Sequence, residues 1–292
     1  MAVAHAVPNS AGTSPPKFKA PANACDCHMH IYDGERFPPA RPASRQQTQA
    51  RVPEYRLLQA RLGTTRNVVV TPAASVTDNR ITLDAIAQLG AGARGVAVVH
   101  PEVSDGELSA LAEGGIRGIR FSVFDPRTAA TRIDMIEPLA RRVNDLGWHV
   151  QLHMRADQIV EAEDLLQRLP CPLVFDHMAR LPQPAGVAHP AFGIVCRLMV
   201  AGCAWVKLSG AYMDTAVGSP TYADTTQVAR AYIKAAPERV VWGSDWPHPT
   251  ESIKPDDAIL FDLLSEWAPD AKTRERILVA NPAELYRFPA CG

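Results

Sequence analysis

The chain has 292 residues, of which 47% are hydrophobic and 21% charged, and its net charge at neutral pH is −1. These values are typical of a globular protein and argue against a basic surface for nucleic acid or for an anionic membrane. No apolar run approaches the roughly 18 residues of a membrane span, and one α/β barrel of about 250 residues would use most of the chain.

Residues 1–22 contain no basic segment followed by an apolar one, so the sequence predicts no secretory signal. Their proline, serine and alanine content predicts a flexible N-terminal arm, followed by a single barrel domain over residues 23–292. The six cysteines lack the spacing of a disulfide framework. Cys25, Cys27 and His28 could suggest a zinc knuckle, but no second cysteine pair follows. Free thiols packed around a strand, in a protein of the reducing cytoplasm, are the favoured interpretation.

Eight short apolar and β-branched runs predict eight strands, over residues 24–30, 67–71, 95–100, 118–123, 149–153, 173–177, 205–209 and 240–243. Several runs are continuously apolar, which is typical of strands buried on both faces. Amphipathic stretches between most of them predict helices over residues 78–89, 105–113, 133–146, 156–169, 192–200 and 226–236. This alternation implies parallel strands with right-handed crossovers. Eight of them favour closure into a single-domain (β/α)₈ TIM barrel of the α/β class.

Two proline-rich segments, residues 32–55 and 181–189, follow predicted strands. Long loops at these ends of barrel strands usually shape a substrate pocket, although a solvated surface loop is an equal alternative for residues 181–189. Residues 90–95 fit the string GxGxxG, but they follow a helix and precede a strand. That order is the reverse of a dinucleotide-binding motif, so a helix end and tight turn are predicted instead.

Polar side chains lie where several apolar runs end, and a closed parallel barrel would bring these ends to one rim. His28 and His30 close the first run. Residues two apart on a strand point to the same face, about 6–7 Å apart, so both imidazoles could share one cation. His153 and His177 end the fifth and sixth runs, and Asp245 follows the eighth. This set favours a functional cluster over a pair of buried structural histidines.

Asp245 could ligate a divalent ion, accept the proton of an attacking water, or do both. A simple cap of the next helix is the structural alternative. Trp246 and Pro247 indicate a rigid, packed turn and favour catalysis. Asp176 precedes His177 on the predicted sixth strand, so we expect its side chain to point to the opposite face and to stabilise the barrel wall.

Arg120 and Lys207 lie within apolar strands, where a cation is costly unless it is paired. Either they pair with internal acids or they meet an anionic ligand. Three more arginines lie close to strand ends: Arg127, Arg155 and Arg180. The rim is therefore expected to bind a small acidic molecule that carries a carboxylate, and no nucleic acid or membrane. Spacing does not decide whether His100 and His248 are exposed or functional.

The strand-end pattern resembles the amidohydrolase superfamily, with HxH on the first strand, histidines on the fifth and sixth, and an aspartate on the eighth. It is most similar to the subgroup of 2-pyrone-4,6-dicarboxylate lactonase, sulfomuconolactone hydrolase and galactarolactone isomerase. The stretches that carry this resemblance are CDCHMH (25–30), GGIRGIRF (114–121), GWHV (147–150), FDHM (175–178), VWGSDWPHP (241–249) and NPAELY (281–286).

The resemblance implies a hydrolase that opens the lactone ring of a carboxylated substrate: a dicarboxylate, a muconolactone-type or a sugar-acid lactone. Asp245 would be the general base. The histidines expected to polarise the carbonyl, directly or through a metal, are His28, His30 and His177. The residues expected to bind substrate are Arg120, Arg127, Lys207, His153, Arg180 and His248. A lactone isomerase of sugar-acid catabolism, a zinc-dependent nonoxidative decarboxylase and a non-catalytic binding protein are the alternatives, and the oligomeric state stays open.

The resemblance also bears on the metal. Pyrone-dicarboxylate lactonase is regarded as metal-free and has a tyrosine where this chain has His153. Arg120 stands where binuclear relatives have a carbamylated lysine, so no such bridge is expected. The remaining ligand set, His28, His30, His153 and Asp245, resembles the mononuclear zinc members. Three histidines and a carboxylate suit Zn²⁺ with room for a water. One divalent metal, zinc, is therefore expected, with metal-free catalysis as the alternative.

Overall fold

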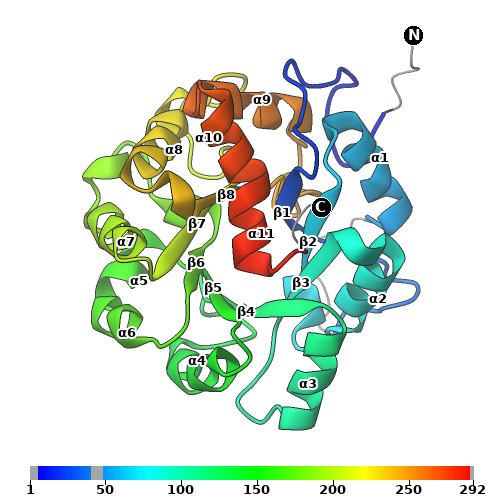
Figure 1. Ribbon diagram of the computed structural model, residues 1–292, viewed down its shortest axis with the longest axis vertical. Helices are drawn as coiled ribbons and strands as arrows, with labels where there is room; N and C mark the ends of the chain where they lie inside the picture. The colour runs from blue at the N-terminus through cyan, green and yellow to red at the C-terminus, as the bar shows by residue number, and fades with distance from the viewer. Residues whose placement is uncertain (1–5, 41–48, 290–292) are drawn as a thin grey trace.

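The computed structural model describes residues 6–40 and 49–289 of the chain. Eight strands form a single parallel sheet in which sequence neighbours pair, in the order β1 to β8 (Figure 1). The strands are β1 (Cys25–Met29), β2 (Arg66–Val70), β3 (Ala93–Ala97), β4 (Ile116–Ser122), β5 (His149–His153), β6 (Leu173–Phe175), β7 (Ala204–Leu208) and β8 (Val240–Trp242). Each of the eight predicted runs therefore forms a strand, with ends that differ by a few residues.

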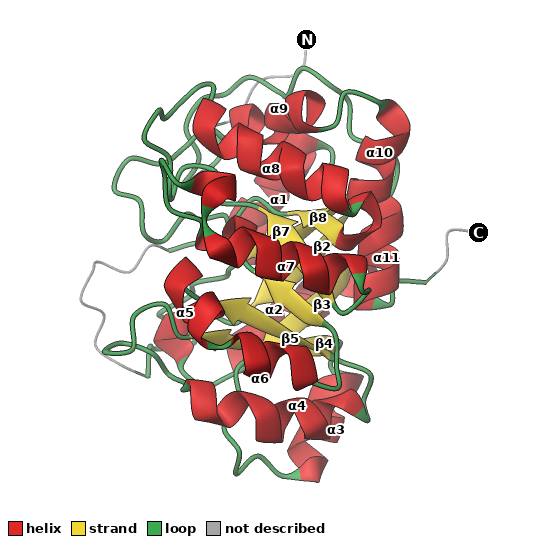
Figure 2. Ribbon diagram, turned by 90° about the vertical axis from the view of Figure 1, so that its left-hand side faces the viewer, coloured by secondary structure: helices red, strands yellow, loops and turns green. Residues whose placement is uncertain are grey.

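Helices surround the strands (Figure 2), so the predicted (β/α)₈ barrel is confirmed. They are α1 (Val52–Leu62), α2 (Arg80–Leu89), α3 (Asp105–Glu113), α4 (Ile136–Asn144), α5 (Ala156–Glu161), α6 (Glu163–Arg168), α7 (Pro190–Val200), α8 (Ala223–Ala235), α9 (Asp257–Trp267), α10 (Ala271–Glu275) and α11 (Asn281–Tyr286). The apolar faces of these helices pack on the strands and bury the core between the two layers.

Two connections differ from their predictions. The segment after β1 was predicted as a loop over residues 32–55, but α1 begins at Val52, because Tyr55 and Leu58 bury a helical face against the barrel. Residues 41–48 of that loop lie outside the described residues. The single helix predicted over residues 156–169 is two helices, α5 and α6, which meet at Ala162 with non-helical dihedral angles.

The ring of strands closes between β1 and the segment that follows β8. Met29 and Trp246 form a parallel bridge. The Asp245 amide donates to the carbonyl of His28 at 2.8 Å, and the His30 amide donates to the carbonyl of Trp246 at 2.8 Å. Ser244 reinforces this seam, because its amide and hydroxyl both donate to the buried carboxylate of Asp26. The first and last strands of the barrel are thereby joined directly beside the predicted site residues.

Helix α11 covers the N-terminal end of the barrel (Figure 1). Its Tyr286 packs edge-on against His149, the first residue of β5, with ring centroids 5.4 Å apart. Asn281 donates to the carbonyl of Val240 at the start of β8 at 2.7 Å. Since this end is covered, the site residues are accessible from the C-terminal ends of the strands, where barrel enzymes have their active sites.

The described part of the N-terminal segment, residues 6–22, lies against the barrel. Val7 is buried, and the carbonyl of Pro8 accepts a 2.8 Å hydrogen bond from the indole of Trp246. Phe18 stacks on Phe261 of α9 with ring centroids 4.6 Å apart. The flexibility predicted for residues 1–22 and the domain boundary after them stay predictions. Among the described residues, no helix has the length and apolar character needed to cross a membrane.

Candidate active site

His28, His30 and Asp245 meet at the C-terminal ends of β1 and β8. The Nε2 atoms of the two histidines are 3.3 Å apart. Asp245 Oδ1 lies 3.5 Å from Nε2 of His28 and 3.6 Å from Nε2 of His30. All three side chains are buried. The structure thus brings the two histidines of the HxH pair to one face, as predicted, and places the aspartate after β8 beside them.

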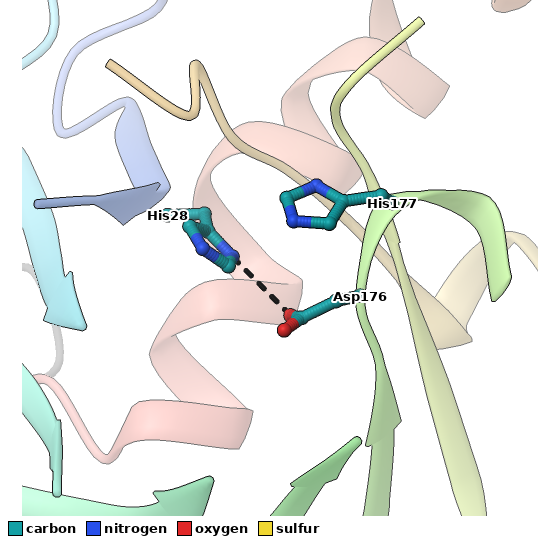
Figure 3. Close-up of side chains that lie close together, drawn as sticks. All are labelled: His28, Asp176 and His177. Atoms are coloured by element: carbon teal, nitrogen blue, oxygen red, sulfur yellow. Dashed lines mark ion pairs between the residues drawn. The ribbon is translucent and has the colours of Figure 1, made fainter. Parts of the chain in front are cut away.

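Asp176 and His177 both point toward His28 (Figure 3). Nε2 of His177 lies 3.8 Å from Oδ1 of Asp245, and Asp176 Oδ1 lies 3.2 Å from Nδ1 of His28. The expectation that Asp176 faces away from the site is therefore wrong. Strand β6 ends at Phe175, and residues 177–180 have positive φ angles between 49° and 60°, so strand alternation does not extend to His177.

Each of the three clustered histidines has a polar partner for its Nδ1 atom. Nδ1 of His30 lies 2.8 Å from the carbonyl oxygen of Val70, which can only accept, so this nitrogen carries the proton and Nε2 is left as an acceptor. Nδ1 of His28 lies 3.2 Å from Oδ1 of Asp176 and 3.3 Å from Nζ of Lys207, so it faces one acceptor and one donor. Nδ1 of His177 lies 2.9 Å from the hydroxyl of Ser209. Burial lowers the pKa of His177 to about 4, so its imidazole is neutral at physiological pH.

Asp176 is the anion in a group of buried polar side chains that lies behind His28 inside the barrel. Arg120 Nε donates to its Oδ2 at 2.9 Å, Gln151 donates to the same oxygen at 3.1 Å, and Nζ of Lys207 lies 3.7 Å from Oδ1. Burial tends to raise the pKa of Asp176, but His28, Arg120 and Lys207 outweigh it and hold this pKa well below its usual range. Asp176 is therefore ionised and compensates the cations around it.

Lys207 is fully buried beneath His28. Its Nζ donates to Oε1 of Gln151 at 2.7 Å and lies 3.3 Å from Nδ1 of His28. Burial lowers the pKa of Lys207 to about 8. The structure thus pairs this cation internally, which was one of the two alternatives that its position in an apolar strand left open. It does not bring Lys207 into the lining of the adjoining cavity.

His153 lies beside the cluster and is held by its own partners. Its Nδ1 lies 3.0 Å from the hydroxyl of Ser122, and Nη1 of Arg180 lies 3.0 Å from its Nε2. Arg180 in turn forms a two-point pair with Asp214, with distances of 2.6 and 3.0 Å. Phe124 stacks on the His153 ring at 5.1 Å. The structure therefore does not group His153 with the other three predicted metal ligands.

A cavity of about 150 Å³ opens beside the cluster at the ends of β4 and β5. Its lining includes Arg120, Ser122, Phe124, Thr128, Thr131 and His153. Arg120 uses Nε on Asp176, and no other described residue accepts a hydrogen bond from its guanidinium, so its outer nitrogens are open to a ligand in the cavity. A larger hollow of about 570 Å³ lies over α2 and α3, and none of the clustered histidines lines it.

Two other predicted substrate-binding residues are placed differently. The side chain of Arg127 is 88% exposed and pairs with Asp125, so the structure does not bring it to the cluster. His248 is fully buried, with Nδ1 3.0 Å from the hydroxyl of Tyr212 and Nε2 3.1 Å from Oδ2 of Asp257. It reaches the site through Tyr212, which donates to Oδ2 of Asp245 at 2.6 Å.

The atoms of His28, His30 and Asp245 fit a bound metal ion. Zinc with ligand bonds of about 2.0–2.1 Å in a tetrahedron separates its ligand atoms by roughly 3.3–3.4 Å. The three observed separations are 3.3, 3.5 and 3.6 Å. The carbonyl of Val70 leaves Nε2 of His30 available for a metal, and Asp176 beside Nδ1 of His28 allows His28 to take the same tautomer when a metal is bound. In the part of the chain that the structure describes, the other possible group is His28 with Asp176 and His177.

Several residues of the described site were not among the predicted site residues. Gln151 could have been found, since it lies on β5 between His149 and His153 and shares their face. Ser209 follows β7 and gives no signal of its own. Tyr212 and Asp257 lie in and beyond loops, where no sequence periodicity reports side-chain direction.

A parallel barrel with a buried histidine–carboxylate cluster at its open end is the architecture of an enzyme. The chain matches the amidohydrolase family over residues 25–288 and belongs to that family. All five cysteines of the described residues are free; Cys25, Cys27 and Cys171 are buried, as predicted for thiols around a strand, whereas Cys196 is half-buried and Cys203 is exposed. Cys291 lies outside the described residues.

Named relatives align along nearly the whole chain. A 2-pyrone-4,6-dicarboxylate hydrolase of Comamonas testosteroni is 35% identical over 286 residues, 94% of each protein. A 4-sulfomuconolactone hydrolase of Rhizobium radiobacter is 33% identical over 282 residues, also 94% of each. A D-galactarolactone isomerase of Agrobacterium fabrum is 29% identical and covers 95% of each. A crystal structure of an Agrobacterium tumefaciens protein superimposes with a TM-score of 0.88 at 27% identity, covering 97% of this chain and 99% of that one.

Proposed function

We propose that this protein hydrolyses the lactone ring of a small carboxylated molecule, with Asp245 as general base. One observation carries the proposal: Oδ1 of Asp245 faces the Nε2 atoms of His28, His30 and His177 at 3.5, 3.6 and 3.8 Å. A carboxylate in contact with three imidazoles is suited to take a proton from water beside a polarised carbonyl. Two relatives named for the hydrolysis of a pyrone and of a muconolactone support the choice of bond.

His28, His30 and Asp245 would hold one divalent metal, and the near-tetrahedral spacing of their ligand atoms favours zinc. When bound, such an ion lowers the pKa of a ligated water and polarises a carbonyl. Asp176 and the carbonyl of Val70 would orient the two imidazoles. The fourth ligand predicted from the sequence, His153, would join only after its contact with Arg180 is broken.

Binding of the substrate carboxylate is assigned to Arg120 in the cavity beside the cluster. Its guanidinium is anchored through Nε to Asp176, which leaves a planar pair of nitrogens for a carboxylate. His153 and the hydroxyl of Ser122 line the same cavity and offer further hydrogen bonds. A cavity of about 150 Å³ suits a compact ring acid rather than a polymer.

The reaction then follows from the positions of these groups. Asp245 takes one proton from water as its oxygen attacks the lactone carbonyl carbon. His177, with its Nδ1 beside Ser209, can carry its proton on Nε2 and donate to the carbonyl oxygen as negative charge develops there. The ring C–O bond then breaks, and Asp245 returns its proton to the departing alkoxide. One water is consumed, and the product is a hydroxy acid whose new carboxyl group releases its proton to solvent.

A lactone isomerase is the second candidate, since the galactarolactone isomerase aligns along nearly the whole chain. The same Asp245 would then move a proton between atoms of the substrate without consuming water. Hydrolysis in H₂¹⁸O must place one ¹⁸O atom in the product carboxylate, whereas isomerisation places none.

The experiment compares the wild-type protein with Asp245→Asn on muconolactone-type and sugar-acid lactones in H₂¹⁸O. We expect ¹⁸O incorporation with the wild type and a loss of at least about 100-fold in kcat for the variant, since a general base contributes that much. Metal analysis of the wild-type protein should give close to one zinc per chain. Turnover without ¹⁸O would favour the isomerase, and an unchanged kcat in Asp245→Asn would exclude this base.

A further inference from the structure

A hydrogen-bonded chain of four side chains runs from the active site to helix α9. Tyr212 donates to Oδ2 of Asp245 at 2.6 Å. Nδ1 of His248 lies 3.0 Å from the Tyr212 hydroxyl, and Nε2 of His248 lies 3.1 Å from Oδ2 of Asp257. The four residues come from the loop after β7, the segment after β8 and the first turn of α9.

The chain is enclosed by protein. His248 and Asp257 are 0% exposed and Asp245 is 1% exposed. The ring of Tyr212 packs edge-on against His248 with centroids 5.2 Å apart. Because buried polar groups need partners, each link in the chain restricts the rotamer of the next one.

The direction of donation is fixed at the active-site end. An ionised carboxylate only accepts, so the Tyr212 hydroxyl keeps its proton and donates it in a hydrogen bond to Oδ2 of Asp245. The Tyr212 oxygen is then an acceptor for the proton on Nδ1 of His248. Oδ2 of Asp257 lies 3.1 Å from Nε2 of the same imidazole and can only accept, so both ring nitrogens of His248 act as donors and the ring is held between Tyr212 and Asp257.

The two carboxylate oxygens of Asp245 have different neighbours, so the orientation of the carboxylate decides which oxygen faces the histidines. Oδ1 faces His28, His30 and His177, while Oδ2 accepts a hydrogen bond from Tyr212 and from no other described residue. The backbone of Asp245 has a φ of 63°, which is uncommon for a residue other than glycine. We therefore expect the direction of the Asp245 side chain to depend on the residues that contact it. Without Tyr212, the carboxylate could rotate and withdraw Oδ1 from the histidines.

We infer that Tyr212, His248 and Asp257 are positioning residues that hold the Asp245 carboxylate in its reactive orientation. This inference rests on the proposed function in assigning Asp245 as the base. The three residues make no step of the reaction themselves. They act through one another, so removing any link should release Asp245 to a similar extent.

The test uses the full-length protein with Tyr212→Phe, His248→Ala and the double variant. Each single change should lower kcat by about tenfold or more with little change in KM, as expected for residues that orient a reactive group or a metal ligand. The double variant should lose no more than the single variants, because the two side chains act in series. His248→Asn retains an N–H close to the position of Nδ1 and should recover most of kcat.

Tyr232→Phe is the matched control, because it also removes a buried tyrosine hydroxyl, one that has no hydrogen-bond partner among the described residues. Its kcat should equal that of the wild type. Thermal unfolding of every variant separates loss of orientation from loss of fold. Losses that add in the double variant, or no recovery in a folded His248→Asn, would overturn the series arrangement.

A second measurement keeps the inference separate from the proposed function. The dissociation constant for Zn²⁺, measured by competition with a chelator, should rise by about tenfold in Tyr212→Phe and in His248→Ala, and not in Tyr232→Phe. If the wild type hydrolyses no lactone, the proposed function fails, while a weakened zinc site in these variants still supports the positioning chain. Unchanged zinc affinity together with unchanged kcat overturns the chain whatever the substrate.

Discussion

Arg120 shows how one side chain can serve both the barrel interior and a ligand. Its Nε is used by Asp176 at 2.9 Å, and the rest of its guanidinium lies at the cavity beside the cluster. A lysine at this position would keep the charge near Asp176 but would lose the planar pair of donors.

Arg120→Lys is therefore expected to raise KM for a carboxylated lactone by about tenfold, which corresponds to the roughly 1.4 kcal/mol of one charge-assisted contact. The change in kcat should be smaller, since Asp245 and the histidines are untouched. Steady-state kinetics on a carboxylated lactone and on its methyl ester provide the measurement. Arg132→Lys, at an exposed pair with Asp134, is the control. A KM increase of equal size for acid and ester would argue against carboxylate binding.

For single residues, the sequence predicted side-chain positions correctly where polar residues lie on a regular strand. His28 and His30 could be predicted to converge, because period-two alternation holds to the end of β1. Asp176 could not be placed, because the left-handed backbone from His177 onward cancels the alternation on which the prediction relied. Whether a cation such as Lys207 pairs internally depends on a carboxylate far away in sequence.

Strands β4 and β5 and helix α11 together enclose one imidazole that the site does not use. His149 begins β5 and is paired in register with Gly118 of β4. A Cβ at Gly118 would lie 2.4 Å from the His149 ring, so glycine leaves the space that the ring fills. Tyr286 of α11 packs edge-on against the other side of the ring. Burial, more than the nearby charge of Lys207, lowers the pKa of His149 to about 3.

This packing predicts a loss of stability in mild acid. Below a pH of about 6.5 the unfolded chain binds a proton at His149, whereas the folded protein does not do so until about pH 3. The unfolded state thus binds more protons in this window, so the free energy of unfolding falls as the pH falls, by up to about 1.4 kcal/mol per pH unit from this group.

Urea unfolding between pH 7 and pH 4 measures this dependence. His149→Phe keeps an aromatic ring against Tyr286 but removes the titrating group, so its free energy of unfolding should fall less steeply with decreasing pH. Parallel pH dependences for the two proteins would show that His149 is not the group responsible.

The elements themselves were predicted to different degrees. Strands were found because they are short apolar and β-branched runs, and helices such as α3 because apolar residues such as Leu108 and Leu111 recur at helical spacing. Helix α1 was not predicted, because it follows a proline- and arginine-rich loop, although Tyr55 and Leu58 have helical spacing. The helices after β8 were not predicted, because no further strand follows to mark them as connections.

Over the whole molecule, the described N-terminal segment connects parts of the fold that carry the site. The carbonyl of Pro8 accepts from Trp246, the residue after Asp245. The hydroxyl of Ser10 accepts from the backbone amide of Asp257 at 3.3 Å, and the amide of Ala11 donates to Pro255 at 2.9 Å. The segment therefore lies over both ends of the loop that runs from β8 to α9.

Deletion of residues 2–11 should consequently affect both stability and activity. Loss of the buried Val7 side chain alone costs about 1.5 kcal/mol, which lowers the melting temperature by roughly 2–4 °C or more in a protein of this size. We also expect a lower kcat at temperatures well below melting, because Trp246 and Asp257 lose their contacts with the segment. Calorimetry and kinetics at 25 °C test both effects. An unchanged melting temperature would mean that the arm contributes nothing to the folded state.

The seam of the barrel carries one more consequence. His28 and Asp245 sit on the two sides of the junction at which the ring closes, and Ser244 and Asp26, which reinforce it, are 218 residues apart in the chain. An opened ring has no site, so any ion or substrate bound there binds the closed ring alone. By mass action, a ligand at 100 times its dissociation constant favours closure by about 2.7 kcal/mol. Occupancy of the site would therefore slow hydrogen exchange at the amides of His30 and Asp245. Binding at the active site and closure of the barrel are thus parts of the same equilibrium.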